Sequence, residues 1–196
     1  MMIVVFGGAF NPPTLAHKEI YQLIIKSLPV EKFIFLPVSK KYSKSSLIAD
    51  NHRLNMLKIL IKDLDKAKIS KLETEENQFL GTYKSLKRLQ KEYENKKVAF
   101  VLGADNLIHL HKWINAEKLI KDFNFIVVNR NNRDVYKLLE KNELLSKYKD
   151  NFIVLEEFNS FISSSLFRET LDPSYVDEDI YHYIMKNDLY RGGNNE

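Results

Sequence analysis

The residues best placed to do chemistry lie near the start of the chain, at positions 7–17, which are Gly-Gly-Ala-Phe-Asn-Pro-Pro-Thr-Leu-Ala-His. A β-branched apolar run precedes them and a helical pattern begins at Leu15, so a buried strand is predicted to pass into a helix here. Gly7 and Gly8 permit a tight turn and close approach of a ligand. Backbone N–H groups and the helix dipole then favour a phosphate, and His17 is expected to lean over the same spot.

The same segment has a plainer interpretation, because strand, turn and helix follow one another in many α/β proteins. The dinucleotide-binding fingerprint is excluded, since its third glycine is missing and Pro12 and Pro13 stand where its helix would begin. Thr14 is a good N-cap for the helix. On local sequence alone, a phosphate site and a purely structural turn are both open.

A second candidate for anion binding lies late in the chain, where Ser163, Ser164 and Ser165 open a predicted helix and Arg168 follows one turn later. Hydroxyls, backbone N–H groups and a guanidinium at one helix start suit a phosphate. Ordinary capping beside a surface arginine is the alternative.

A third set of polar residues follows the fourth predicted strand. Gly103 permits close approach of a ligand to the backbone. For Asp105 three roles are open: it accepts hydrogen bonds from ribose hydroxyls, it assists a metal, or it caps the following helix. Trp113, the only tryptophan, either stacks on an aromatic ring or packs in the core. His109 and His111 lack a third ligand at a recognisable spacing, so no zinc site is expected.

Polar side chains also follow the second strand and open the third helix. The loop after the second strand carries Lys40, Lys41 and Lys44, which either reach phosphates or stay solvated. Thr82 and Ser85 place hydroxyls at the third helix start, where capping is the default explanation.

The second predicted helix contains a charged pair in its first turn. Asp50 is predicted as its N-cap. Arg53 is either a solvated charge or a residue that holds the preceding loop in place.

Strand and helix patterns alternate along the chain, and this alternation must position the polar segments. Strands are predicted near 2–6, 32–37, 67–71, 97–102, 123–128 and 151–155. Helices are predicted near 15–28, 51–64, 82–94, 114–121, 132–147 and 176–184, with another opened by the serine cluster. We expect an α/β protein: a Rossmann-like doubly wound parallel sheet with helices on both faces, in which ligands bind beyond the carboxyl ends of the strands.

Length and composition bound the class of protein. The 196 residues suit a single domain over 1–196, whose last ~5 residues are expected to fray. No apolar run approaches the ~20 residues that span a bilayer, and no leader pattern is visible, so no membrane contact is expected. The absence of cysteine excludes disulfides and thiol catalysis and fits the cytoplasm.

The net charge of +4 and the pI of about 9.0 favour anionic partners in general. The 30 basic residues alternate with 26 acidic ones, a pattern typical of solvated helix faces. Nucleic-acid binding is not expected, since aromatic-and-basic stripes are not seen. The sequence does not specify the oligomeric state, and a homo-oligomer is left open.

Four blocks, in a fixed order, carry a resemblance to a known family. Gly8, Phe10, Pro12 and His17 match G-x-F-x-P-x-H-x-G-H, and Ile162 to Arg168 is similar to I-S-S-T-x-x-R. The other blocks are Leu102 to Asn106 with Trp113, and the tail residues Ile180, Tyr183, Ile184, Asn187, Leu189 and Tyr190. Together they resemble the nicotinate/nicotinamide mononucleotide adenylyltransferase family of the nucleotidyltransferase superfamily, most of all its bacterial nicotinate-nucleotide form, over nearly the whole chain.

The resemblance implies transfer of the adenylyl group of ATP to nicotinate mononucleotide, giving deamido-NAD and pyrophosphate in NAD biosynthesis. It implies Mg²⁺ bound through the ATP phosphates and no metal site in the protein. The implied ATP-binding residues are Gly7, Gly8, Ala9, Phe10, Thr14, His17, Gly103, Asp105, Ser163, Ser164 and Arg168. The implied mononucleotide-binding residues are Asn11, Thr82, Ser85 and Trp113. The implied catalytic residues are His17, Arg168 and a lysine, for which Lys44 is preferred to Lys40 and Lys41.

Three positions depart from the family pattern. Thr14 replaces the first signature histidine and removes one donor to the transferred phosphoryl group, although related mononucleotide adenylyltransferases also tolerate threonine there. Ala16 replaces the signature glycine. Lys84 stands where many relatives carry an acid, which weakens the assignment of the pyridine-side loop.

The nucleophile of such a reaction is already a phosphate oxyanion, so no general base and no covalent enzyme intermediate are expected. The alternatives are nicotinamide mononucleotide as the preferred acceptor, a sister enzyme such as pantetheine-phosphate adenylyltransferase, and a non-catalytic nucleotide- or RNA-binding protein. The choice between nicotinate and nicotinamide depends on backbone groups facing the ring substituent, which side-chain identity does not reveal.

Overall fold

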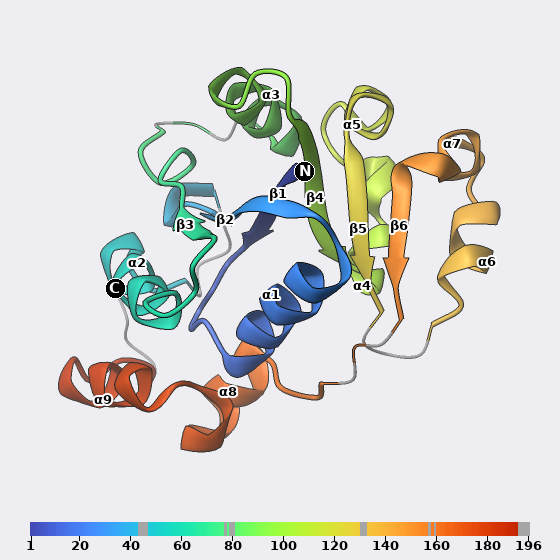
Figure 1. Cartoon of the computed structure of the whole chain (residues 1–196). Coiled ribbons are helices and arrows are strands. Elements are labelled where there is room, and N and C mark those ends of the chain that lie inside the picture. The colour runs from blue at the N-terminus through green and yellow to red at the C-terminus, as the bar shows by residue number, and fades with distance from the viewer. Residues whose placement is uncertain are drawn as a thin grey trace. The chain divides into compact units, whose positions relative to one another are not determined.

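The computed structural model of the chain describes residues 1–42, 47–76, 78, 81–129, 133–156, 158 and 160–191 (Figure 1). Its strands are β1 (Met2–Gly8), β2 (Val30–Pro37), β3 (Ala67–Ile69), β4 (Lys97–Gly103), β5 (Asn124–Val128) and β6 (Phe152–Leu155). Its α-helices are α1 (Leu15–Ser27), α2 (Asp50–Leu60), α3 (Thr82–Glu92), α4 (Ala104–Leu107), α5 (Ala116–Asp122), α6 (Val135–Glu140), α7 (Glu143–Lys147), α8 (Ser164–Thr170) and α9 (Glu178–Lys186). The predicted strands are all present, with bounds that differ by at most two residues.

The strands form one sheet in the order β3-β2-β1-β4-β5-β6. β1 pairs in parallel with β4, β4 with β5 and β5 with β6, so that Val4 lies opposite Ala99 and Val101 opposite Ile126. The order runs outward from β1 in both directions, which is the doubly wound arrangement of the Rossmann fold. The predicted α/β class is confirmed.

The chain forms two compact units. The first unit comprises Met1–Gly7, Leu28–Ile34 and Leu80–Ser160, and the second comprises Gly8–Ser27, Phe35–Phe79 and Phe161–Glu196. The first therefore holds β4, β5 and β6, and the second holds α1, α2, α8 and α9. The prediction that residues 1–196 form a single domain stays a prediction.

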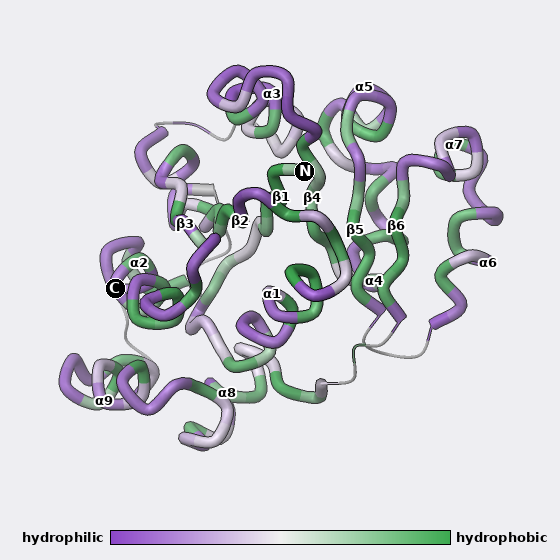
Figure 2. Tube along the Cα trace, in the orientation of Figure 1, coloured by the Kyte–Doolittle hydropathy of each residue, from purple (hydrophilic) through white to green (hydrophobic). Residues whose placement is uncertain are grey.

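The core of the first unit consists of strands whose central residues are all apolar. Fully buried residues of β1 and β5 are Ile3, Val4, Val5, Phe125, Ile126 and Val127. Such continuous apolar runs are typical of strands covered on both faces. α3 and α4 pack on β4, and α4 also contacts β5. Figure 2 shows the hydrophobic residues concentrated along β4, β5 and β6.

The second unit is held by helices whose buried faces follow helical spacing. α1 buries Ala16, Ile20, Tyr21 and Ile24. α2 packs on α9, where the Tyr183 hydroxyl lies 2.9 Å from His52 Nδ1 and accepts from Asn55 Nδ2 at 3.1 Å. The C-terminal helix is thus fastened to the helix that follows the lysine-rich loop.

The helices differ from prediction between 132 and 147, where the single predicted helix is wrong and α6 and α7 stand instead. Asn142 Oδ1 accepts from Leu145 N–H at 3.2 Å and begins a new helix, as Asp134 does for α6 through Lys137 N–H. In the part of the chain that the structure describes, no helix has both the length and the apolar character needed to cross a bilayer.

Candidate active site

The chain turns after β1 at Phe10 and not at the glycines. Gly7 and Gly8 are the last two residues of β1, and the left-handed conformation falls at Phe10, whose φ is 47°. The predicted tight turn at the glycines is therefore wrong. A Cβ at Gly8 would lie 3.1 Å from Phe10 Cζ, and Phe10 is 1% exposed. A larger residue at this position would press on the buried Phe10 ring, which would have to shift by a few tenths of an ångström.

A buried arginine of α2 fixes the loop that follows β1. Arg53 is 0% exposed, its Nη1 donates to Ala9 O at 2.5 Å, and its Nη2 donates to Val38 O after β2. Nη2 also donates to Asp50 Oδ1 at 2.6 Å. A buried charge must be paired and hydrogen-bonded to be stable. The sequence left two interpretations of Arg53 open, and the structure shows that it holds the preceding loop and Ala9 as well.

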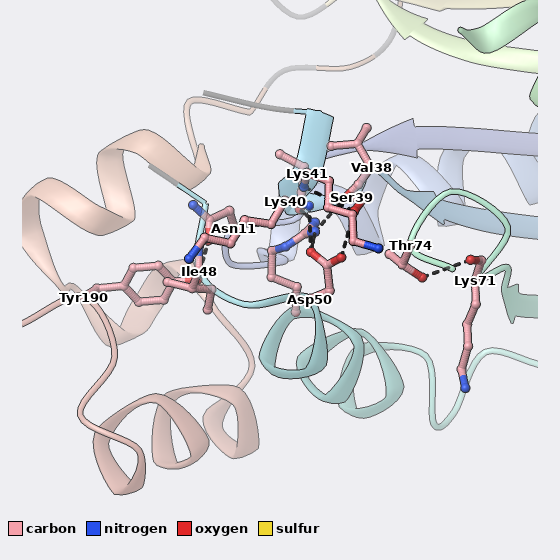
Figure 3. Close-up of polar contacts among 12 residues, drawn as sticks. Asn11, Val38, Ser39, Lys40, Lys41, Ile48, Asp50, Lys71, Thr74 and Tyr190 are labelled. Carbon is pink, nitrogen blue, oxygen red and sulfur yellow. Dashed lines mark hydrogen bonds and ion pairs between the residues drawn. The ribbon is translucent and has the colours of Figure 1, made fainter. Parts of the chain in front are cut away.

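The Asp50 carboxylate binds the segment that follows β2, as Figure 3 shows. It accepts from Ser39 Oγ at 3.0 Å and from Lys40 N–H at 2.8 Å. The predicted N-cap role is wrong, because Ala49 is the N-cap of α2 and the Asp50 carboxylate serves the loop. Burial acts to raise the pKa of Asp50, but the hydrogen bonds from Lys40 N–H and Arg53 outweigh it and hold that pKa below its usual value.

Three segments distant in the sequence meet at Asn11. Its Oδ1 accepts from Ile48 N–H at 3.4 Å and from the Tyr190 hydroxyl at 3.0 Å (Figure 3). Burial raises the pKa of Tyr190, so the hydroxyl keeps its proton and donates it. Arg168 Nη1 donates to Asn11 O at 2.7 Å. Asn11 is 1% exposed, so the protein sets its amide orientation, and its predicted contact with a mononucleotide stays a prediction.

The start of α8 contacts the same loop. Ser164 Oγ donates to Pro12 O at 2.8 Å, and Arg168 Nη2 donates to Ser165 Oγ at 3.3 Å. Ser163 Oγ accepts from Leu166 N–H at 3.1 Å and caps the helix. The two segments expected to bind phosphate are therefore in direct contact. The ATP contacts of these side chains stay predictions.

His17 lies at the start of α1 with its ring held from two sides. Thr14 N–H donates to His17 Nδ1 at 2.9 Å, and Thr14 Oγ1 also lies 2.9 Å from that nitrogen. The Phe10 ring centroid is 5.1 Å from that of the imidazole. Thr14 is 0% exposed, so its hydroxyl faces His17, and its predicted contact with ATP stays a prediction.

In the first unit, Trp113 lies against the ring of Phe100. The ring centroids are 6.1 Å apart with an interplanar angle of 81°. A Cβ at Gly7 would lie 2.7 Å from Phe100 Cζ, so glycine at this position makes room for the ring that supports the tryptophan. Trp113 is half-buried: its indole packs against Phe100, and part of its surface remains accessible to solvent. Stacking of that part on a ligand stays a prediction.

The start of α3 lies beside the Trp113 segment. Gly81, at φ 78°, is the N-cap of α3, and a Cβ there would lie 3.3 Å from Ile114 Cβ. Because Gly81 is the N-cap residue, neither Thr82 nor Ser85 occupies that position, and the expectation that one of them is the N-cap is wrong. Thr82 is half-buried and Ser85 is 3% exposed. Their contacts with a mononucleotide stay predictions.

The carboxyl end of β4 is open at Gly103, where an added Cβ would meet no atom of the described residues within 4 Å. α4 begins at Ala104, so Asp105 lies inside its first turn and does not cap it. Asp105 Oδ1 instead accepts from Arg133 Nε at 3.0 Å. Sequence reasoning missed Arg133, although a basic residue soon after β5 was a visible signal.

The three candidates for the phosphate-side lysine are Lys40, Lys41 and Lys44. Lys44 lies outside the described residues. Lys40 donates its backbone N–H to Asp50, and Lys41 Nζ donates to Glu76 O at 3.3 Å. The preference for Lys44 stays a prediction.

Among the described residues, no three His, Asp or Glu side chains gather as metal ligands do. The groups around the Phe10 loop are instead hydroxyls, backbone N–H groups and a guanidinium, and these suit phosphate oxygens. The predicted binding of Mg²⁺ through the phosphates of ATP stays a prediction.

Comparison with known proteins matches this arrangement to one family. A family model described as cytidylyltransferase-like matches residues 5–170. The chain is 35% identical to the "probable nicotinate-nucleotide adenylyltransferase" of Acholeplasma laidlawii, over 96% of this chain and 97% of that protein. The protein of that name from Clostridium perfringens is 32% identical, over 96% and 98%. The chain belongs to the nicotinate-nucleotide adenylyltransferase family.

Solved structures with a similar name also match the chain over nearly its whole length. Plasmodium falciparum nicotinic acid mononucleotide adenylyltransferase complexed with NaAD matches with a TM-score of 0.80 and 26% identity, over 96% of both chains. The same protein complexed with APC matches with a TM-score of 0.78. As a member of the nicotinate-nucleotide adenylyltransferase family, the chain is a nucleotide-binding nucleotidyltransferase of NAD biosynthesis.

Proposed function

We propose that this enzyme transfers the adenylyl group of ATP to nicotinate mononucleotide and releases pyrophosphate. The observation that carries the proposal is the joined pair of anion-binding segments in the second unit. Ser164 and Arg168 of α8 donate to the carbonyls of Pro12 and Asn11 in the loop after β1. The nicotinate acceptor is supported by the names of the relatives.

In the proposed reaction an oxygen of the mononucleotide phosphate attacks the α-phosphorus of ATP. One P–O bond forms, the bond from the α-phosphorus to the bridging oxygen breaks, and pyrophosphate leaves with that electron pair. Because the nucleophile is already ionised, the protein needs no general base. Its task is to align the two phosphates and stabilise the charge that builds on their oxygens. Mg²⁺ bound to the phosphates shares that task.

The proposed ATP-binding residues are Gly7, Gly8, Ala9, Phe10, Thr14, His17, Gly103, Asp105, Ser163, Ser164 and Arg168. Of these, the fully buried Thr14 acts through its contact with His17. A guanidinium has five N–H donors, and within the described part of the chain Arg168 donates from two nitrogens, to Asn11 O and Ser165 Oγ. The donors not engaged there suit the oxygens of a triphosphate. Arg168 is thus held by the loop that it helps to form, and it keeps donors for the anion.

The proposed mononucleotide-binding residues are Asn11, Thr82, Ser85 and Trp113. The accessible part of Trp113 suits stacking on the pyridine ring, since Phe100 holds the indole from one side. The Gly81–Ile114 contact places the start of α3 next to this tryptophan. We assign the phosphate-side lysine to Lys44.

The test is a substrate panel on the full chain. The protein is incubated with MgATP and either nicotinate mononucleotide, nicotinamide mononucleotide or phosphopantetheine, and pyrophosphate and the dinucleotide product are measured. We expect the highest kcat/KM with nicotinate mononucleotide and loss of activity with EDTA. A higher value with phosphopantetheine, or no pyrophosphate with either pyridine mononucleotide, overturns the proposal. A preference for nicotinamide mononucleotide overturns only the choice of acceptor.

A further inference from the structure

Thr14, one of the positions at which this chain departs from the family signature, contacts the signature histidine directly. Thr14 is fully buried, and both its N–H and its hydroxyl oxygen lie 2.9 Å from His17 Nδ1. A residue with no exposed surface cannot present its hydroxyl to a nucleotide without a rearrangement of the loop. Its chemistry is therefore directed at the imidazole.

The backbone N–H and the hydroxyl of Thr14 together favour one position for the proton of His17. An amide N–H only donates, so Nδ1 must offer its lone pair, and a proton on Nδ1 would face the amide hydrogen. The neutral ring must then carry its proton on Nε2, across the ring from Thr14. The Thr14 hydroxyl oxygen lies 2.9 Å from the same nitrogen, and with Nδ1 unprotonated it donates there and strengthens the same arrangement.

The orientation of the ring is fixed as well as its proton. Phe10 lies against the imidazole with a centroid separation of 5.1 Å and an interplanar angle of 58°. Phe10 is 1% exposed, so this contact comes from the packed interior and does not depend on a ligand. Nδ1 is held by Thr14 and one side of the ring is held by Phe10, which leaves the ring little freedom to rotate.

We propose that Thr14 is a positioning residue that holds His17 as a neutral imidazole with its proton on Nε2. This inference rests on the proposed function in one respect, namely that the Nε2–H group serves the phosphate oxygens of ATP. A neutral donor adds a directed hydrogen bond without a full positive charge, so it attracts the ground-state triphosphate weakly. Its contribution grows as charge builds on the transferred group, and it acts on kcat more than on KM.

The first test needs no substrate. The full chain is labelled with ¹⁵N-histidine, and the His17 signals are assigned by their loss in His17→Gln. At neutral pH we expect a pyridine-like shift for Nδ1 and a pyrrole-like shift for Nε2. A pyrrole-like Nδ1, an imidazolium pattern or the averaged shifts of a freely exchanging ring overturns the proposal. Because no nucleotide is present, failure of the proposed function leaves this result untouched.

The second test removes the hydroxyl alone. Thr14→Val keeps the shape and the backbone N–H, and we expect a larger population of the other tautomer and a kcat about 5-fold to 10-fold lower, with KM for ATP nearly constant. Thr14→Ser restores the hydroxyl and is expected to recover most of both losses. Thr74→Val, which removes an exposed hydroxyl bonded to Lys71 O, is the matched control.

A merely structural role for Thr14 predicts a different outcome. It would lower the melting temperature of Thr14→Val while leaving the ¹⁵N shifts of His17 and kcat as in the parent, and that result overturns the proposal. Should Thr14→Val fail to fold, the shifts of the parent chain and of Thr14→Ser still decide it.

Discussion

The loop after β1 in the second unit and the Trp113 segment in the first unit are built by different forces. In the loop, the carbonyls of Ala9, Asn11 and Pro12 accept hydrogen bonds from side chains far along the sequence. Around Trp113 the contacts are apolar: an edge-on ring contact with Phe100 and a close approach of Gly81 to Ile114.

This difference matches the two tasks proposed for the regions. Phosphoryl transfer needs atoms aligned within a fraction of an ångström, and directional hydrogen bonds enforce such alignment. Holding a flat ring needs an accessible aromatic face, which apolar packing supplies with some latitude. Substitutions in the loop should therefore change stability or kcat, and substitutions near Trp113 should change the KM for the mononucleotide.

The largest expected effect comes from Arg53, whose removal strips two loop carbonyls and Asp50 of their donor. We expect Arg53→Leu to lower the free energy of unfolding by about 3 kcal/mol, because breaking a buried pair leaves the partner groups unsatisfied. Urea unfolding measures it. Arg88→Leu, at an exposed position of α3, is the matched control. A loss below about 1 kcal/mol would show that the loop does not depend on this arginine.

The next effect concerns chemistry. We expect His17→Ala to lower kcat by ~10² or more, about 2.7 kcal/mol, with a smaller change in the KM for ATP, because the lost donor acts mainly in the transition state. Steady-state pyrophosphate release measures both constants. His182→Ala, at an exposed histidine of α9, is the control and should leave them unchanged. Full activity of His17→Ala would remove this histidine from the mechanism.

Substitution of Trp113 tests the task proposed for the first unit. We expect Trp113→Ala to raise the KM for the mononucleotide about 10-fold, through loss of ring stacking, and Trp113→Phe to raise it less. Kinetics at saturating ATP measure it. Tyr136→Ala, at an aromatic residue that is 58% exposed in the same unit, is the control. An equal rise in the KM for ATP would contradict the division of tasks between the two regions.

The strands could be predicted from the sequence more completely than the loop after β1, for a physical reason. Apolar runs predicted the strand bounds to within two residues, because a buried strand requires a local run of apolar residues that is visible in the sequence. The split at Asn142 was missed because a single polar residue inside a helical pattern gives only a weak local signal.

The loop was predicted only in part, since its contacts are long-range. Asn11 and Tyr190 are 179 positions apart, and the residues next to either one give no sequence signal of their hydrogen bond. The sequence could not show that Arg53 is buried, because arginine is usually exposed and its pairing depends on the tertiary fold. Phe10 at positive φ was equally hidden, because bulky residues rarely adopt that conformation and the adjacent glycines drew the prediction.

The smallest expected effect is a change in acid stability at Asp50. Its pKa in the folded chain lies below its usual value of ~3.9, so the stability it contributes is fully present above that value and is lost as pH falls through the folded pKa. Asp50→Asn removes this dependence, and we expect its unfolding free energy to change less with pH than that of the parent between neutral pH and about pH 3.

Urea unfolding at several pH values measures the slope. Asp105→Asn in the first unit is the control, because its ion pair with Arg133 is more than a third exposed on both sides, at 39% and 43%, and such pairs contribute little to stability. If Asp50→Asn keeps the parent slope while Asp105→Asn flattens it, the charge that matters lies in the first unit. That result would contradict the inference that the loop after β1 is more tightly constrained than the first unit.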